Sequence, residues 1–191
     1  MPWQVALVRP NGDDPFCGGT LISNRHVLTA AHCTGVNGGI WDIIVGEHST
    51  TNSADGTRHT KCRAVDHPQY NSSTTNNDYA IVHLNQPVQL GPRAMHACLP
   101  TSSMGGDFLA GKTLTVSGWG ARSPSDGGPN VLHKVDIPGV TNAACARDWF
   151  PGQITNKMLC AGSDDNSGSI AIGACFGDSG GKHKVYNKFT S

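Results

Sequence analysis

The sequence is poor in charge, and the charge that it has is balanced. Charged residues make up only 15% of the 191 positions, and 14 Lys and Arg residues offset 14 Asp and Glu residues, so the formal net charge is +0. No basic or acidic run stands out. Proteins that bind nucleic acids or anionic membranes concentrate positive charge, so we expect neither kind of partner.

Long apolar runs are also missing. No stretch approaches the ~20 consecutive apolar residues that a membrane-spanning helix needs. Met1–Trp3 lacks the charged head and apolar core of a secretory signal peptide. None of the nine histidines has zinc-site spacing such as His-Glu-x-x-His, and we expect no metal or cofactor.

Glycine and cysteine are plentiful instead. The 24 Gly residues favour a loop-rich β protein over a helical one. Seven cysteines indicate an oxidising compartment, and their odd number leaves at least one without a partner in the chain. A disulfide-type sequence without a signal peptide leads us to expect a secreted protein whose N-terminal segment is not included.

Short β-like runs recur between turn signals, which is typical of an all-β sandwich or barrel. Thr141 is placed to cap a short helix over Asn142–Asp148, and the proline-containing segment Asn85–Pro100 reads as a connector between two halves. The expected strands are Gln4–Val8, Thr20–Ile22, Trp41–Val45, Cys62–Asp66, Tyr79–Leu84, Thr113–Ser117 and Val131–Ile137.

The sharpest chemical signal is Gly177–Gly181, which reads Gly-Asp-Ser-Gly-Gly. Glycines on both sides let the backbone turn tightly and present Ser179 to a substrate. The N–H groups of Gly177 and Ser179 would then stabilise an oxyanion formed by attack. Taken alone, the segment is equally well a flexible turn.

Two further segments offer partners for a nucleophilic serine. His32 follows an apolar strand and two alanines, whose small side chains let other groups pack closely around the imidazole. Asp78 opens the apolar run Tyr79–Leu84, and a partly buried carboxylate there needs a hydrogen-bond donor such as an imidazole N–H. Separately, a structural histidine and a turn aspartate are the simpler interpretations.

Together, the order His, Asp, Ser is a known triad order, and the sequence resembles the trypsin/chymotrypsin family of serine endopeptidases. The resemblance runs from Pro2 to Gly181. The segments that carry it are Pro2–Leu7, Thr29–Cys33, Asp78–Ile81, Ser117–Gly120, Met158–Gly162 and Gly177–Gly181.

The resemblance implies two six-stranded antiparallel β-barrels, the second incomplete here. It makes Ser179 the nucleophile, His32 the general base and Asp78 the residue that orients His32. It also implies disulfides Cys17–Cys33 and Cys145–Cys160. Cys98 matches a position that often bonds to a pro-segment, and Cys62 has no family partner, so a Cys62–Cys98 bridge stays open.

Two departures from the family lower the expected activity. The family's free N-terminus pairs with the acid at Asp178, and that segment is not in the sequence; a broken buried pair costs about 3–5 kcal/mol. Lys182 replaces the family's proline, which suggests a deletion that also removes the partner of Cys175. We expect weak or no activity, and a non-catalytic, protease-like binding protein is the alternative.

The specificity pocket and the family's calcium loop also differ. Gly173 stands where trypsin-like members carry the aspartate that binds Arg or Lys, so Gly173 and Ala174 predict an apolar or broad preference. Glu47 matches the first acid of the calcium loop and Asp55 is a candidate substitute, but the carboxylates are too few for a calcium site. Asn71–Ser73 is a glycosylation acceptor pattern.

These observations predict one serine protease domain over residues 1–191. Its parts are an N-terminal barrel (1–84), a connector (85–103) and a partial C-terminal barrel (104–191). The expected partners are protein or peptide substrates and a pro-segment joined through Cys98. We expect the protein to be a monomer.

Overall fold

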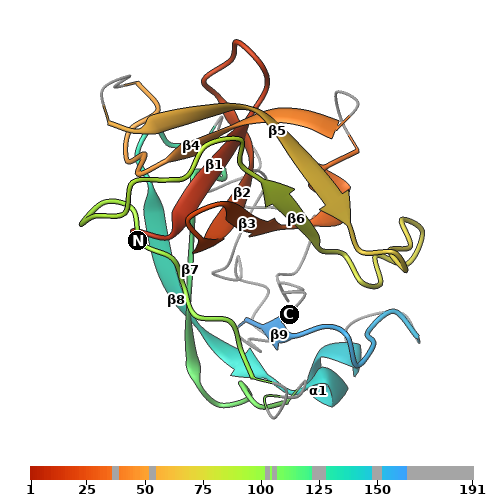
Figure 1. Ribbon diagram of the computed structural model, residues 1–191. Helices are drawn as coiled ribbons and strands as arrows, with labels where there is room; N and C mark the ends of the chain where they lie inside the picture. The colour runs from red at the N-terminus through yellow and green to blue at the C-terminus, as the bar shows by residue number, and fades with distance from the viewer. Residues whose placement is uncertain are drawn as a thin grey trace.

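The N-terminal strands form a closed antiparallel barrel. This computed structural model describes residues 1–35, 39–51, 55–101, 104, 107–121, 128–147 and 152–162. The strand order around the barrel is β1-β2-β3-β6-β5-β4, and β1 pairs with β4 to close it (Figure 1). The six strands are β1 (Gln4–Val8), β2 (Pro15–Ser23), β3 (His26–Thr29), β4 (Ile40–Val45), β5 (Thr57–Asp66) and β6 (Ala80–His83).

Alternating side chains fill the inside of this barrel. Val27 of β3 lies opposite Val82 of β6, and both are fully buried in one apolar cluster. Val5 and Leu7 project into the same cluster from β1. Burying a side chain of this size stabilises a fold by about 1.5–3 kcal/mol, so the alternation fixes which face of each strand points inward.

Strand β1 is buried on both faces. Its alternate residues Ala6 and Val8 pack outside the barrel against Trp119, in a second cluster that includes Ile44. The indole Nε1 of Trp119 donates a hydrogen bond to the carbonyl O of His48 at 3.3 Å. A strand covered on both sides reads as a continuous apolar run, which explains the absence of polar residues after Gln4 in β1.

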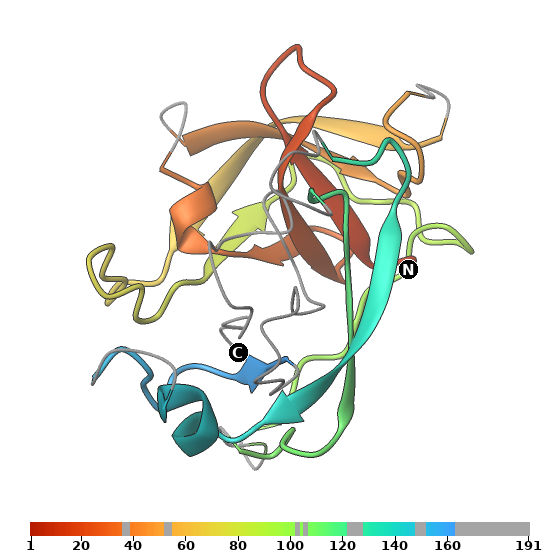
Figure 2. The ribbon, with the colours of Figure 1, turned by 180° about the vertical axis from the view of Figure 1, so that it is seen from behind.

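The C-terminal half contributes a three-stranded antiparallel sheet in the order β7-β8-β9. Its strands are β7 (Thr113–Gly118), β8 (His133–Val140) and β9 (Cys160–Ala161), and the helix α1 spans Asn142–Arg147. The hydroxyl of Thr141 accepts a hydrogen bond from the N–H of Ala144, which caps α1 as predicted. Seen from behind in Figure 2, α1 and β9 lie at the end of the molecule remote from the barrel.

The fold is therefore all-β and chymotrypsin-like, as the sequence predicted. The strand β9 was not expected, and β3 was expected only as an apolar strand before His32, without bounds. Other strands differ at their ends: β2 begins at Pro15 and β5 at Thr57, both several residues early. Between β6 and residue 101 no helix or strand occurs, apart from an isolated bridge between Gly91 and Ala94. The domain boundaries stay predictions. Among the described residues, no helix has the length and hydropathy to cross a membrane.

Two disulfides join Cys17 to Cys33 and Cys145 to Cys160. Cys62 and Cys98 are free, so the bridge between them that the sequence left open is not formed. Cys62 is fully buried, and burial, followed by the nearby carboxylate of Asp42, raises the pKa of its thiol to about 11. Cys98 is exposed.

This contrast predicts selective alkylation. Iodoacetamide at pH 8 should modify Cys98 in the folded protein and reach Cys62 only after denaturation, because a buried thiol with a raised pKa exposes little thiolate. Peptide mass spectrometry before and after denaturation measures both sites. Equal modification of the two thiols in the folded protein would contradict the predicted protection of Cys62.

A second prediction concerns Gly139 in β8. A Cβ at this position would overlap the carbonyl O of Leu109, and the neighbouring backbone is fixed because the Gly139 N–H donates to the Lys112 carbonyl at 2.8 Å. Gly139→Ala should therefore lower the free energy of unfolding by about 1–3 kcal/mol.

The matched control is Gly35→Ala, because nothing lies within 4 Å of a Cβ built at Gly35. Urea unfolding curves of the two variants and the parent protein compare the free energies. If Gly139→Ala is as stable as Gly35→Ala, the result would contradict the close contact between β8 at Gly139 and the Leu109 carbonyl.

Candidate active site

Strand pairing brings His32 and Asp78 together although they are 46 positions apart. Thr29, the last residue of β3, lies opposite Ala80, the first residue of β6. Because the strands are antiparallel, the chain leaving β3 and the chain entering β6 meet at one edge of the barrel. His32 lies in the 3-10 helix η1 (Ala31–Cys33) just after β3.

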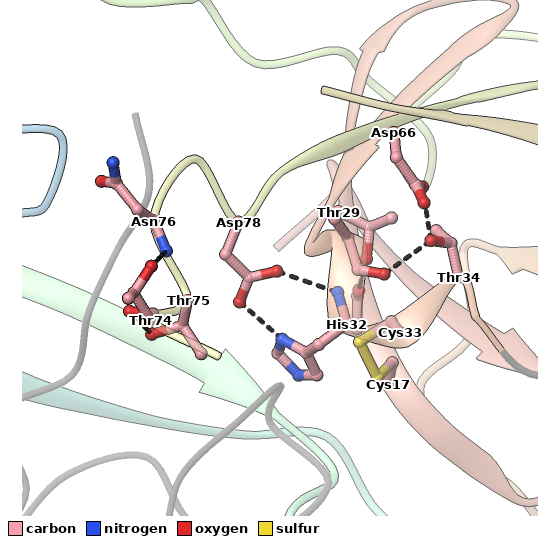
Figure 3. A network of polar contacts seen from close by, with 12 residues as sticks. Cys17, Thr29, His32, Cys33, Thr34, Asp66, Thr74, Thr75, Asn76 and Asp78 are labelled. Atoms are coloured by element: carbon pink, nitrogen blue, oxygen red, sulfur yellow. Dashed lines mark hydrogen bonds and ion pairs between the residues drawn. A yellow bond between two sulfur atoms is a disulfide. The ribbon is translucent and has the colours of Figure 1, made fainter. Parts of the chain in front are cut away.

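His32 and Asp78 make two hydrogen bonds (Figure 3). The Nδ1 atom of His32 lies 2.7 Å from Oδ2 of Asp78, and the backbone N–H of His32 donates to Oδ1 at 2.8 Å. An ionised carboxylate only accepts hydrogen bonds, so Nδ1 carries the ring proton. Nε2, on the other side of the ring, is then the nitrogen that can accept a proton.

Burial differs between the two side chains. Asp78 keeps 12% of its side-chain surface exposed, whereas His32 keeps 34%. Burial of a carboxylate is costly unless donors compensate it, and the two donors of His32 supply that compensation. The imidazole of His32 is therefore the more solvent-exposed member of the pair.

Neighbouring contacts hold the His32 turn in place. The Cys17–Cys33 disulfide lies beside the imidazole, and the hydroxyl of Thr29 donates to the Gly18 carbonyl at 2.8 Å (Figure 3). These contacts fix both ends of the segment that carries His32. The two cysteines and His32 lie close enough to suggest a metal site, but disulfide sulfurs are not thiolate ligands.

Sequence reasoning missed the contact between Thr34 and Asp66. The Thr34 hydroxyl lies within hydrogen-bond distance of both the Ala31 carbonyl and the Asp66 carboxylate, and so ties η1 to the end of β5. The two residues are 32 positions apart, and no local pattern marks either of them. Only knowledge of how the barrel strands pair could have indicated that Thr34 and Asp66 lie together.

Tyr70 was also missed. Burial, followed by the carboxylates of Asp78 and Asp66, raises the pKa of its phenol. A phenol with an ordinary pKa is already neutral at pH 7, and the shift is upward, so Tyr70 adds no negative charge beside Asp78. The loop before Asp78 folds back on itself, because the Asn71 N–H donates to the Asn76 carbonyl at 3.1 Å.

Glu47 and Asp55, the candidate calcium ligands, lie apart from His32 and Asp78 in the barrel's β4–β5 connection. Glu47 is buried, and its pKa is raised by burial and by Asp55. Asp55 is already engaged, because Arg93 lies 3.2 Å from its Oδ1 and the Ser49 N–H donates to its Oδ2. Calcium takes six to eight oxygen ligands, and these described residues fit it poorly.

The other predicted site residues fall outside the described part of the chain. They are Gly173, Ala174, Gly177 and Ser179, together with Asp178 and Cys175. Of the predicted triad, the structure therefore describes the His32–Asp78 pair, and the disulfide cysteines Cys17, Cys33, Cys145 and Cys160 are all described.

Comparison with known proteins identifies the family of the chain. A family model described as Trypsin matches residues 1–183. Kallikrein-15 of Homo sapiens is 34% identical over 193 aligned positions, which cover 94% of this chain and 70% of the relative. Kallikrein-15 of Saguinus oedipus is 33% identical with the same coverage. The chain therefore belongs to the trypsin family of serine proteases.

Proposed function

We propose that this protein is a serine endopeptidase in which Ser179, His32 and Asp78 form the catalytic triad. The observation that carries the proposal is the pair of hydrogen bonds from His32 to Asp78, which leaves Nε2 as the proton-accepting nitrogen. The order of the three residues in the sequence and the family membership support it.

In the proposed reaction, Ser179 Oγ attacks the carbonyl carbon of a peptide bond while His32 Nε2 takes its proton. His32 then gives that proton to the leaving amine as the peptide C–N bond breaks, and an acyl-enzyme remains. A water molecule attacks the acyl group in the same way and restores Ser179. Asp78 keeps the proton on Nδ1 and stabilises the imidazolium in both half-reactions.

The remaining site residues are assigned from the sequence. The N–H groups of Gly177 and Ser179 would stabilise the oxyanion, a contribution of about 10²–10³ in rate for one donor. Gly173 and Ala174 place no charge in the specificity pocket, so an apolar or broad preference is expected.

The proposed setting is extracellular, since two disulfides form. Its substrates would be proteins or peptides, and a monomer suffices for this mechanism. Cys98 is exposed and free, which leaves its thiol accessible to a pro-segment. The proposed domain organisation is a barrel over 1–84, a connector over 85–103 and a partial second barrel over 104–191.

A fluorophosphonate probe tests the nucleophile. We expect slow labelling, weaker than that of a trypsin standard because Lys182 alters the segment after Gly181, and complete loss of labelling in Ser179→Ala. The control Ser72→Ala changes an exposed serine and should label like the parent. If folded protein is not labelled, or labels without Ser179, the non-catalytic binding role becomes the better explanation.

The role of Asp78 has its own test. Asp78→Asn should lower kcat by about 10⁴, as known for such triads, because the amide favours the wrong imidazole tautomer. Asp136→Asn, in β8 and bonded to Thr115, is the matched control and should leave kcat unchanged. Steady-state hydrolysis of a short peptide ester measures both, and a loss below tenfold for Asp78→Asn would rule out its proposed role.

A further inference from the structure

The pattern Asn71-Ser72-Ser73 is the one Asn-x-Ser/Thr acceptor sequence in the 191 residues, and the structure places it beside the proposed site. The N–H of Asn71 donates to the carbonyl O of Asn76 at 3.1 Å, two residues before Asp78. The preceding residue, Tyr70, is close enough for the Asp78 carboxylate to affect its phenol.

The Asn71 side chain is held in one orientation. Its Oδ1 accepts hydrogen bonds from the backbone N–H groups of Ser73 at 2.9 Å and Thr74 at 3.1 Å. Residues 71 to 74 are all exposed. Among the described residues, neither Nδ2 of Asn71 nor the hydroxyl of Ser73 has a hydrogen-bond partner. The turn therefore uses the oxygen of the amide and leaves the nitrogen facing solvent.

Hydrogen bonds hold the rest of the loop, residues 74–77, in a defined conformation. Thr75 and Asn77 hold left-handed backbone angles, with φ of 53° and 54°, and the Asn77 side chain donates to the Gln69 carbonyl at 3.0 Å. The hydroxyl of Thr155 donates to the Asn76 side-chain oxygen at 2.8 Å, so the loop also contacts the C-terminal half. Figure 3 shows Thr74, Thr75 and Asn76 next to Asp78.

We propose that Asn71 carries an N-linked glycan that screens this side of the active site from large substrates. In the modification, Nδ2 of Asn71 attacks the anomeric carbon of a lipid-diphosphate-linked oligosaccharide. The new C–N bond forms as the C–O bond to the diphosphate breaks; the lipid diphosphate leaves, and Nδ2 gives up one proton to a base. Such glycans are bulky and hydrophilic.

The screening depends on substrate size. A short peptide approaches as a narrow strand, whereas a folded protein approaches with a surface of hundreds of Å². A bulky group attached at Asn71, in the loop before Asp78, obstructs a folded protein more than it obstructs a short peptide. This part of the inference rests on the proposed endopeptidase function, whereas the modification itself does not.

Three variants test the modification in protein secreted from a eukaryotic host. The parent and Ser73→Thr should lose mass on treatment with peptide N-glycosidase F, with Asn71 converted to Asp. Ser73→Ala should show no such loss, although it keeps the turn, because Ser73 bonds to Asn71 through its backbone N–H. Unmodified Asn71 in the parent would overturn the proposal.

Two readouts test the screening. In Ser73→Ala, the ratio of kcat/KM for native serum albumin, a folded protein, to kcat/KM for a short peptide should rise several-fold, while Ser73→Thr keeps the parent ratio. Subtilisin should also nick residues 67–79 faster in Ser73→Ala, and this readout needs no activity of the protein itself. Equal ratios or equal nicking would refute the screening, whereas loss of fluorophosphonate labelling alone would refute only the endopeptidase function.

Discussion

The antiparallel pairing of β3 with β6 is the constraint on which the site depends. It places the end of one strand against the beginning of the other, and so brings an imidazole to a carboxylate across 46 positions of sequence. A slip of one residue would turn Val27 and Val82 out of the barrel. The same apolar contacts that stabilise the barrel therefore fix the geometry of His32 and Asp78.

The electrostatics of this edge follow from how the carboxylates are paired. Asp78 receives two donors from His32, and Asp66 is bonded by the hydroxyl of Thr34. Burial, followed by both acids, raises the pKa of the Tyr70 phenol, which is neutral at pH 7 in any case. Each of these two carboxylates therefore has at least one hydrogen-bond donor within the described part of the chain.

Much of the fold could be predicted from the sequence because its signals are local. Short alternating or continuous apolar runs located most of the strands, the hydroxyl of Thr141 marked the start of α1, and six short segments marked the family. Strand ends were less predictable, since Pro15 and Thr57 join strands through long-range pairing rather than local preference. The Thr34–Asp66 and Asn76–Thr155 contacts had no local signal, because each joins segments that only the folded barrel brings together.

Strand β1 has a consequence for how the molecule can be divided. Because one face fills the barrel and the other covers Trp119, it belongs to both halves at once. Cutting the chain in the connector would expose the apolar side chains of Ala6 and Val8 on one fragment. Trp119, which packs against them, would be exposed on the other fragment. Because β1 is shared, we expect the two fragments to fold by associating with each other and not independently.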